Sequence, residues 1–174
     1  FNPVHLAHLV MADQVQNQLG LDKVYLMPTY LPPHVDEKKT ISSEHRLAML
    51  ELAVADNPCL DIEPIELIRK GKSYTYDTMK ALKEANPDTD YYFIIGGDMV
   101  EYLPKWHRID DLLHLVQFVG IRRPNYPTES TYPIIWVDVP QMAISSTLIR
   151  QKVKSGCSTR YLLPENVINY IQEK

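Results

Sequence analysis

The sequence predicts an α/β fold in which helices are doubly wound around a mainly parallel sheet. Short apolar runs alternate with amphipathic stretches along the whole chain. The apolar runs are mostly continuous, as in parallel strands that are buried on both faces. The 174 residues, of which 45% are hydrophobic, suffice for one domain with its own core. We therefore expect a single domain over residues 1–174.

Five segments are expected to be strands because β-branched and aromatic residues are concentrated in them. In chain order they are residues 24–27, 60–62, 91–95, 116–121 and 134–137. Strand and helix alternate, so the sheet is expected to bind ligands beyond the carboxyl ends of its strands.

Six segments have apolar residues at helical spacing. In chain order they are residues 5–19, 44–55, 76–85, 108–114, 145–155 and 164–173. Ser43 and Thr75 mark helix starts, and Gly20, Pro87 and Gly156 mark helix ends.

Two irregular stretches remain, at residues 28–43 and 122–133. Loops of this length in a compact domain are usually functional or mobile. The first contains Pro32, Pro33 and His34, and we expect either a substrate lid or a surface excursion stiffened by its prolines.

Charge and cysteine content exclude several classes of protein. The chain has 18 Lys and Arg against 22 Asp and Glu, so its net charge of −4 is unsuited to coating nucleic acid. Cys59 and Cys157 have no metal-site or disulfide spacing, which favours the reducing cytoplasm. No apolar run reaches the roughly 18 residues of a membrane helix, so we expect no membrane association.

The chain opens with Phe1-Asn2-Pro3-Val4-His5-Leu6-Ala7-His8, which leads into the first expected helix. His5 and His8 are three residues apart and should project from one face of its first turn. Free N–H groups and the helix dipole favour an anion there, and two imidazoles add donors. The segment indicates a phosphate site, although two surface or capping histidines would also explain it. Zinc is disfavoured because no third ligand lies nearby in the sequence.

A second segment, Ile144-Ser145-Ser146-Thr147-Leu148-Ile149-Arg150, opens another expected helix. The hydroxyls of Ser146 and Thr147, the backbone N–H groups and the charge of Arg150 suit a polyphosphate. Helix capping alone would also explain the hydroxyl side chains.

Gly96-Gly97-Asp98 follows the strand at residues 91–95. The glycines allow a ligand to approach the backbone, and Asp98 could meet a ribose hydroxyl or a metal-bound phosphate. A simple turn is the alternative. Tyr102 and Trp106 are four residues apart, so we expect them on one helical face, either as a platform for a flat ring or packed onto the sheet.

The segment Gly71-Lys72-Ser73-Tyr74-Thr75-Tyr76-Asp77-Thr78 precedes the helix at 76–85. Thr75 or Asp77 could cap this helix, whose first N–H groups could bind a carboxylate. The chain has no serine nucleophile elbow, Walker loop or GxGxxG motif. The expected chemistry is therefore the positioning and charge stabilisation of phosphates without a covalent enzyme intermediate.

Taken together, residues 1–8 and 144–150 resemble the two signatures of nucleotidyltransferases with an HxGH motif. With Gly96-Gly97-Asp98 and Trp106 between them, the whole chain resembles the bacterial nicotinate-nucleotide adenylyltransferase family. Ala7 replaces the glycine of the family motif. Val35 stands where many relatives carry lysine, which leaves Lys38 or Lys39 as substitutes. The family signature begins with a strand and a glycine-rich turn, and we expect both to be missing from this sequence.

The resemblance implies a Rossmann-like nucleotidyltransferase fold. It also implies transfer of AMP from ATP to nicotinate mononucleotide, which gives nicotinate adenine dinucleotide and pyrophosphate in NAD synthesis. Magnesium would travel with ATP rather than occupy a dedicated metal site. The implied catalytic residues are His5, His8 and Arg150. The implied ATP-binding residues are Phe1, His5, His8, Asp98, Ser146, Thr147 and Arg150. The implied mononucleotide-binding residues are Tyr74, Thr75, Tyr76, Tyr102 and Trp106.

Three alternatives stay open. Pantetheine-phosphate adenylyltransferase shares the second signature but usually carries threonine where this chain has His5. A regulatory module would bind ATP without turnover, and a structural α/β interaction domain would bind no nucleotide. The sequence decides neither between an acid and an amide mononucleotide nor between a monomer and a homo-oligomer.

Overall fold

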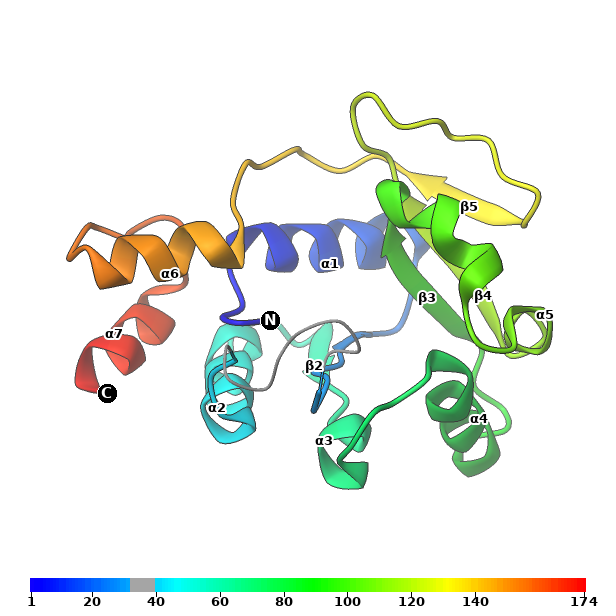
Figure 1. Cartoon of the computed structure of the whole chain (residues 1–174), viewed down its shortest axis with the longest axis horizontal. Coiled ribbons are helices and arrows are strands. Elements are labelled where there is room, and N and C mark those ends of the chain that lie inside the picture. The colour runs from blue at the N-terminus through cyan, green and yellow to red at the C-terminus, as the bar shows by residue number, and fades with distance from the viewer. Residues whose placement is uncertain (32–39) are drawn as a thin grey trace. The chain divides into compact units, whose positions relative to one another are not determined.

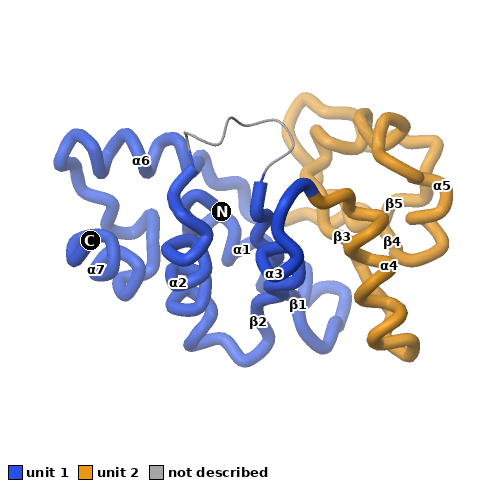
Figure 2. Tube along the Cα trace, turned by 60° about the horizontal axis from the view of Figure 1, so that its bottom comes forward, with its two compact units in different colours: residues 1–72, 140–174 blue, residues 73–139 orange. Residues whose placement is uncertain are grey.

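The computed structural model describes residues 1–31 and 40–174 (Figure 1). The chain divides into two compact units, which are coloured separately in Figure 2. Unit 1 comprises Phe1–Lys72 and Pro140–Lys174, and unit 2 comprises Ser73–Val139. The alternation of strands and helices confirms the predicted α/β class.

Unit 1 contains a two-stranded parallel sheet of β1 (Val24–Leu26) and β2 (Leu60–Ile62), in which Val24 is paired with Leu60. Its helices are α1 (Leu6–Leu19), α2 (Ser43–Val54), α3 (Ile65–Arg69), α6 (Ser146–Lys154) and α7 (Glu165–Glu173). Helix α1 buries Ala12 and Val15 and ends at Gly20, whose left-handed backbone matches the expected helix stop. Helix α2 packs against both β2 and α7 (Figure 1).

Unit 2 contains a three-stranded parallel sheet in the order β3 (Tyr91–Gly96), β4 (Val116–Ile121) and β5 (Ile134–Val137). Its helices are α4 (Thr75–Ala85), the 3-10 helix η2 (Gly97–Lys105) and the short α5 (Ile109–Leu112). Phe93, Trp106 and Phe118 meet edge to face, with ring centroids 5.9–6.0 Å apart, and form the aromatic part of the core.

All five expected strands and all six expected helices are present, with ends shifted by a few residues. Within the described residues the strands form two parallel sheets, one in each unit. Two helical elements, α3 and η2, were not predicted from the sequence. Helix α3 has only five residues, and η2 combines a three-residue turn with an internal Pro104, so neither has the spacing of an α-helix. In the described part of the chain, no helix is both long and apolar enough to cross a membrane.

Candidate active site

The two N-terminal histidines lie at the start of α1. His5 is the N-cap residue with an extended backbone, and its N–H donates to Nδ1 of His8 at 3.1 Å. The two imidazole rings are stacked, with centroids 3.7 Å apart, and the ring of Phe1 meets that of His8 edge-on at 4.7 Å. His5 is only 4% exposed, so the pair is a packed cluster rather than two surface side chains.

Both histidines are neutral near pH 7. Burial is the main cause that lowers the pKa of His5 from 6.5 to about 4. Burial, followed by repulsion from His5, lowers the pKa of His8 to about 3. Because Nδ1 of His8 accepts a backbone hydrogen bond, its ring hydrogen is on Nε2. Nδ1 of His5 is buried and makes no hydrogen bond of ordinary geometry among the described residues, while the His5 side chain faces the backbone N–H of His8 in a capping-box arrangement.

The second signature opens α6 and is joined directly to the segment before α1. Oγ of Ser146 donates to the carbonyl of Pro3 at 2.8 Å. The Arg150 guanidinium donates from Nη1 to the carbonyl of Asn2 at 2.8 Å and from Nη2 to Oγ1 of Thr147 at 3.2 Å. The residues joined by the Ser146–Pro3 and Arg150–Asn2 hydrogen bonds are 143 and 148 positions apart in the sequence. The structure thus joins the two motifs that carried the resemblance.

Capping explains part of the second signature. Ser145 is the N-cap of α6, and its Oγ accepts from the N–H of Leu148 at 3.1 Å. The single hydroxyl hydrogen of Ser146 is already donated to Pro3. Ser146 can therefore offer a ligand its backbone N–H, whereas Thr147 only accepts from Arg150 and keeps its own hydroxyl hydrogen to donate.

Arg46 is a residue of this region that sequence reasoning missed. It is 4% exposed and donates to the carbonyls of Thr29, Tyr30 and Ile41. Arg46 and Arg150 both act electrostatically at Phe1, so both add positive potential where the first signature starts. The sequence could have indicated the burial of Arg46, because its helical spacing places it on the same face of α2 as the apolar residues Met49, Leu50 and Ala53.

In unit 2, Asp98 lies just after β3 and faces an arginine. Nε of Arg123 is 3.7 Å from Oδ1 of Asp98. Arg123 follows the carboxyl end of β4, so the two side chains share the edge of the sheet where ligands bind in α/β proteins. Sequence reasoning named Asp98 but not Arg123, although a cation two residues after a buried strand was a signal that could have found it.

Gly97 is required by packing. A Cβ at this position would lie 2.6 Å from the carbonyl oxygen of Ile121 and 3.3 Å from the ring of Trp136. The absence of a side chain therefore lets η2 pack on β4 and β5. This gives Gly97 a reason for being glycine that does not involve a ligand.

The expectation that Tyr102 and Trp106 share one helical face is wrong. The segment is a 3-10 helix that ends at Lys105, and residues four apart do not align at three residues per turn. Tyr102 is 46% exposed and lies under the ammonium of Lys105. Trp106 is an extended residue beyond the helix and packs edge-on against Phe93 and Phe118.

Tyr74, Thr75 and Tyr76 form the start of α4. Tyr74 is the N-cap and Thr75 the first helical residue, and in the described part of the chain no side-chain hydrogen bond caps this helix. The expected capping by Thr75 or Asp77 is therefore wrong. The Tyr76 ring is buried in the core, whereas Tyr74 is 41% exposed. A ligand would meet the backbone here and the side chain of Tyr74.

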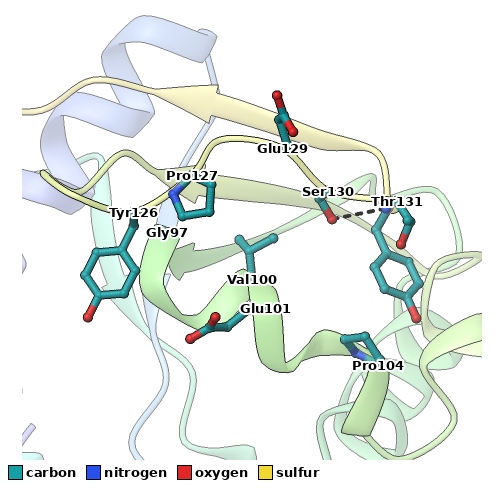
Figure 3. Close-up of a pocket in the computed structure, with 10 residues that line it drawn as sticks. Gly97, Val100, Glu101, Pro104, Tyr126, Pro127, Glu129, Ser130 and Thr131 are labelled. Atoms are coloured by element: carbon teal, nitrogen blue, oxygen red, sulfur yellow. Dashed lines mark hydrogen bonds between the residues drawn. The ribbon is translucent and has the colours of Figure 1, made fainter.

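A separate cavity of about 150 Å³ lies between η2 and the loop that follows β4 (Figure 3). Val100 forms its floor, and Pro104 and Tyr126 line it. Its ten lining residues include two acids, Glu101 and Glu129, and no Lys, Arg or His. Such a lining does not suit a phosphate, so the cavity is not a candidate for the nucleotide.

Two expectations lie partly or wholly outside the described residues. Half of the proposed lid, including Pro32, Pro33 and His34, falls between residues 32 and 39, as do Val35, Lys38 and Lys39. Within the residues that are described, no group of three or more His, Cys, Asp or Glu side chains could hold a metal ion.

Comparison with known proteins decides the family. Residues 1–152 match the model of the cytidylyltransferase-like family. A relative from Streptococcus pneumoniae, named probable nicotinate-nucleotide adenylyltransferase, is 62% identical over 174 residues, which are 100% of this chain and 83% of the relative. The chain belongs to the nicotinate-nucleotide adenylyltransferase family. A Lactococcus lactis member with the same name is 60% identical over 99% of this chain and 88% of its own length.

Solved structures support the fold of the family. The nicotinic acid mononucleotide adenylyltransferase of Plasmodium falciparum, complexed with NaAD, superposes with a TM-score of 0.79 over 99% of this chain and 91% of its own. A second structure of that protein, complexed with APC, has the same TM-score and covers 90% of its own chain. Both are 17% identical to this chain, so they establish its nucleotidyltransferase fold.

Proposed function

We propose that the chain transfers AMP from magnesium ATP to nicotinate mononucleotide and releases pyrophosphate. The observation that carries the proposal is the junction of the α1 and α6 N-termini through Ser146–Pro3 and Arg150–Asn2. Two helix N-termini, two neutral imidazoles and a guanidinium are thereby gathered in unit 1, which suits a triphosphate. The name shared by relatives of at least 60% identity supports the same activity.

The reaction needs positioned donors and no general base. A phosphate oxygen of the mononucleotide attacks the α-phosphorus of ATP in line, and the bond from that phosphorus to the bridging oxygen of the β-phosphate breaks. The attacking phosphate is already anionic at neutral pH. Pyrophosphate leaves with the electron pair of the broken bond, and charge on the leaving oxygens rises during the step.

In unit 1, His5 and His8 would stabilise the α-phosphate and the leaving group through their ring N–H groups. The arriving polyanion would also favour protonation of these imidazoles. Thr147 and Arg150 would hold the β- and γ-phosphates, together with the backbone N–H of Ser146. Phe1 would contact ATP from its position against the ring of His8. Magnesium belongs to the substrate, since it reaches the protein bound to ATP.

In unit 2, the backbone at Tyr74, Thr75 and Tyr76 would bind the carboxylate of the pyridine ring. Trp106 would contact the ring, with Tyr102 nearby. Asp98 would bind at a ribose or at the magnesium-linked phosphates, and Arg123 beside it would add the charge that an acceptor phosphate needs. The proposal includes a single functional domain over residues 1–174 and a cytoplasmic location. The free thiols of Cys59 and Cys157 are compatible with that reducing compartment.

Pyrophosphate release from magnesium ATP tests the proposal. The acceptors are nicotinate mononucleotide, nicotinamide mononucleotide and phosphopantetheine, each supplied in parallel. We expect turnover that depends on nicotinate mononucleotide and falls at least a hundredfold in His5→Ala but not in the control His114→Ala. His114 is exposed and outside both signatures. Turnover with phosphopantetheine alone, or ATP binding without release, would refute the assignment.

A further inference from the structure

His107 lies beside the N-terminus of α4 but belongs to none of the motifs that identified the family. Its ring is stacked at a tilt on that of Tyr74, with centroids 4.4 Å apart and an interplanar angle of 33°. It also meets the Tyr76 ring edge-on at 6.5 Å. Both tyrosines flank the first residue of α4, so the imidazole lies at the helix end to which the proposed function assigns the pyridine carboxylate.

The neighbouring Arg108 is already engaged. Its guanidinium lies 4.1 Å above the Tyr76 ring, and its Nε is 2.9 Å from Oδ2 of Asp111. Arg108 has a left-handed backbone with φ of 51°, and this turn places successive side chains on the two tyrosines. Arg108 also interacts electrostatically with Asp77 in the first turn of α4. The acids on this face are thus balanced by Arg108, and His107 stays available to a ligand.

A second observation points to a ligand at this helix end. Oγ of Ser73, two residues before the eleven-residue α4, is buried and has no hydrogen-bond partner among the described residues. Buried hydroxyls in native proteins are almost always hydrogen-bonded, so an unmatched one suggests a bound group. The helix N–H groups, the hydroxyl and the exposed imidazole together offer donors to an anion.

We propose that His107 is the residue that selects a carboxylate over a carboxamide on the pyridine ring of the acceptor. This inference rests on the proposed function. Backbone N–H groups can donate to either oxygen, so α4 alone discriminates weakly. An imidazole N–H that donates to an ionised carboxylate makes a charge-assisted hydrogen bond, which is about twice as strong as a neutral one. An uncharged amide gains no such term.

Two variants and a control test this role. His107→Phe keeps a ring on Tyr74 but removes the donor, and His107→Gln keeps a neutral donor. His114→Phe is the matched control on an exposed histidine of the same unit. The readout is the ratio of kcat/KM for nicotinate mononucleotide to kcat/KM for nicotinamide mononucleotide.

We expect His107→Phe to lower this ratio about tenfold through a higher KM for the acid, with the amide within twofold of wild type. His107→Gln should fall between the two, and His114→Phe should match wild type. An unchanged ratio, or an equal loss for both acceptors, would overturn the proposal, because a merely structural role weakens both. If the wild-type chain turns over neither acceptor, the proposed function fails, and calorimetric binding of the two mononucleotides to wild type and His107→Phe decides the inference separately.

Discussion

Ser146 provides a sharp test because its hydroxyl hydrogen is already used inside the protein. Ser146→Ala removes the 2.8 Å hydrogen bond to the carbonyl of Pro3, a buried residue. Loss of one partner of such a bond costs about 1–3 kcal/mol, and the half-buried position of Ser146 favours roughly 1.5 kcal/mol. In a chain of this size that corresponds to a fall in Tm of about 3–6 °C.

The same geometry predicts a small effect on substrate binding. Since the Ser146 hydroxyl cannot donate to Pro3 and to a phosphate at once, KM for ATP should rise less than about threefold. Thr147→Val is the comparison: Thr147 keeps its hydrogen for a ligand, so KM should rise about five- to tenfold at nearly unchanged Tm. Thermal unfolding and ATP titrations of both variants give the answer. An unchanged Tm with a tenfold higher KM for ATP in Ser146→Ala would refute the assignment of the Ser146 hydroxyl to the Pro3 carbonyl.

Three further predictions follow from the structure. Arg46→Met should lower the free energy of unfolding by about 3 kcal/mol, because three backbone carbonyls lose their hydrogen-bond donor. The control Arg160→Met replaces an exposed arginine and should change this free energy by less than about 0.5 kcal/mol; urea denaturation measures both. The contribution of His5 and His8 to the free energy of unfolding should be fully present above pH 6.5. As the pH drops toward 4, the free energy of unfolding should fall by up to about 1.4 kcal/mol per pH unit for each histidine, because only the unfolded chain binds the protons. A free energy of unfolding from urea denaturation that stays constant between pH 7 and pH 4.5 would contradict the burial of the pair. Trp106→Ala should cost about 2–4 kcal/mol by removing edge-to-face contacts and should raise KM for the mononucleotide, whereas an effect on KM alone would mean that the ring does not support the core.

Local patterns were sufficient for most of the fold. Apolar strands and helix ends such as Gly20 depend on neighbours within a few residues, and the structure confirms them. The His5–His8 spacing likewise placed both rings on one turn. Tyr102 and Trp106 were misplaced because the prediction assumed an α-helical period where Pro104 lies inside a 3-10 helix.

Tertiary contacts account for what the sequence could not reveal. The bond of Ser146 to Pro3 spans 143 residues and uses a hydroxyl that looked available to ligands. The burial of Arg46 and the approach of Arg123 to Asp98 likewise depend on which segments fold together. The sequence positions of Arg46 on an apolar helix face and of Arg123 after a buried strand indicate where these side chains lie, but not which groups they contact.

The central claim is that the chain joins the adenylyl group of ATP to nicotinate mononucleotide. Incubation of the chain with magnesium ATP and nicotinate mononucleotide, followed by mass spectrometry of the nucleotides and a parallel pyrophosphate determination, tests this claim most directly. We predict one nicotinate adenine dinucleotide for each pyrophosphate released, and neither product when His5 and His8 are both replaced by alanine. ATP consumed to AMP or ADP without the dinucleotide, or ATP bound and recovered intact, would contradict it.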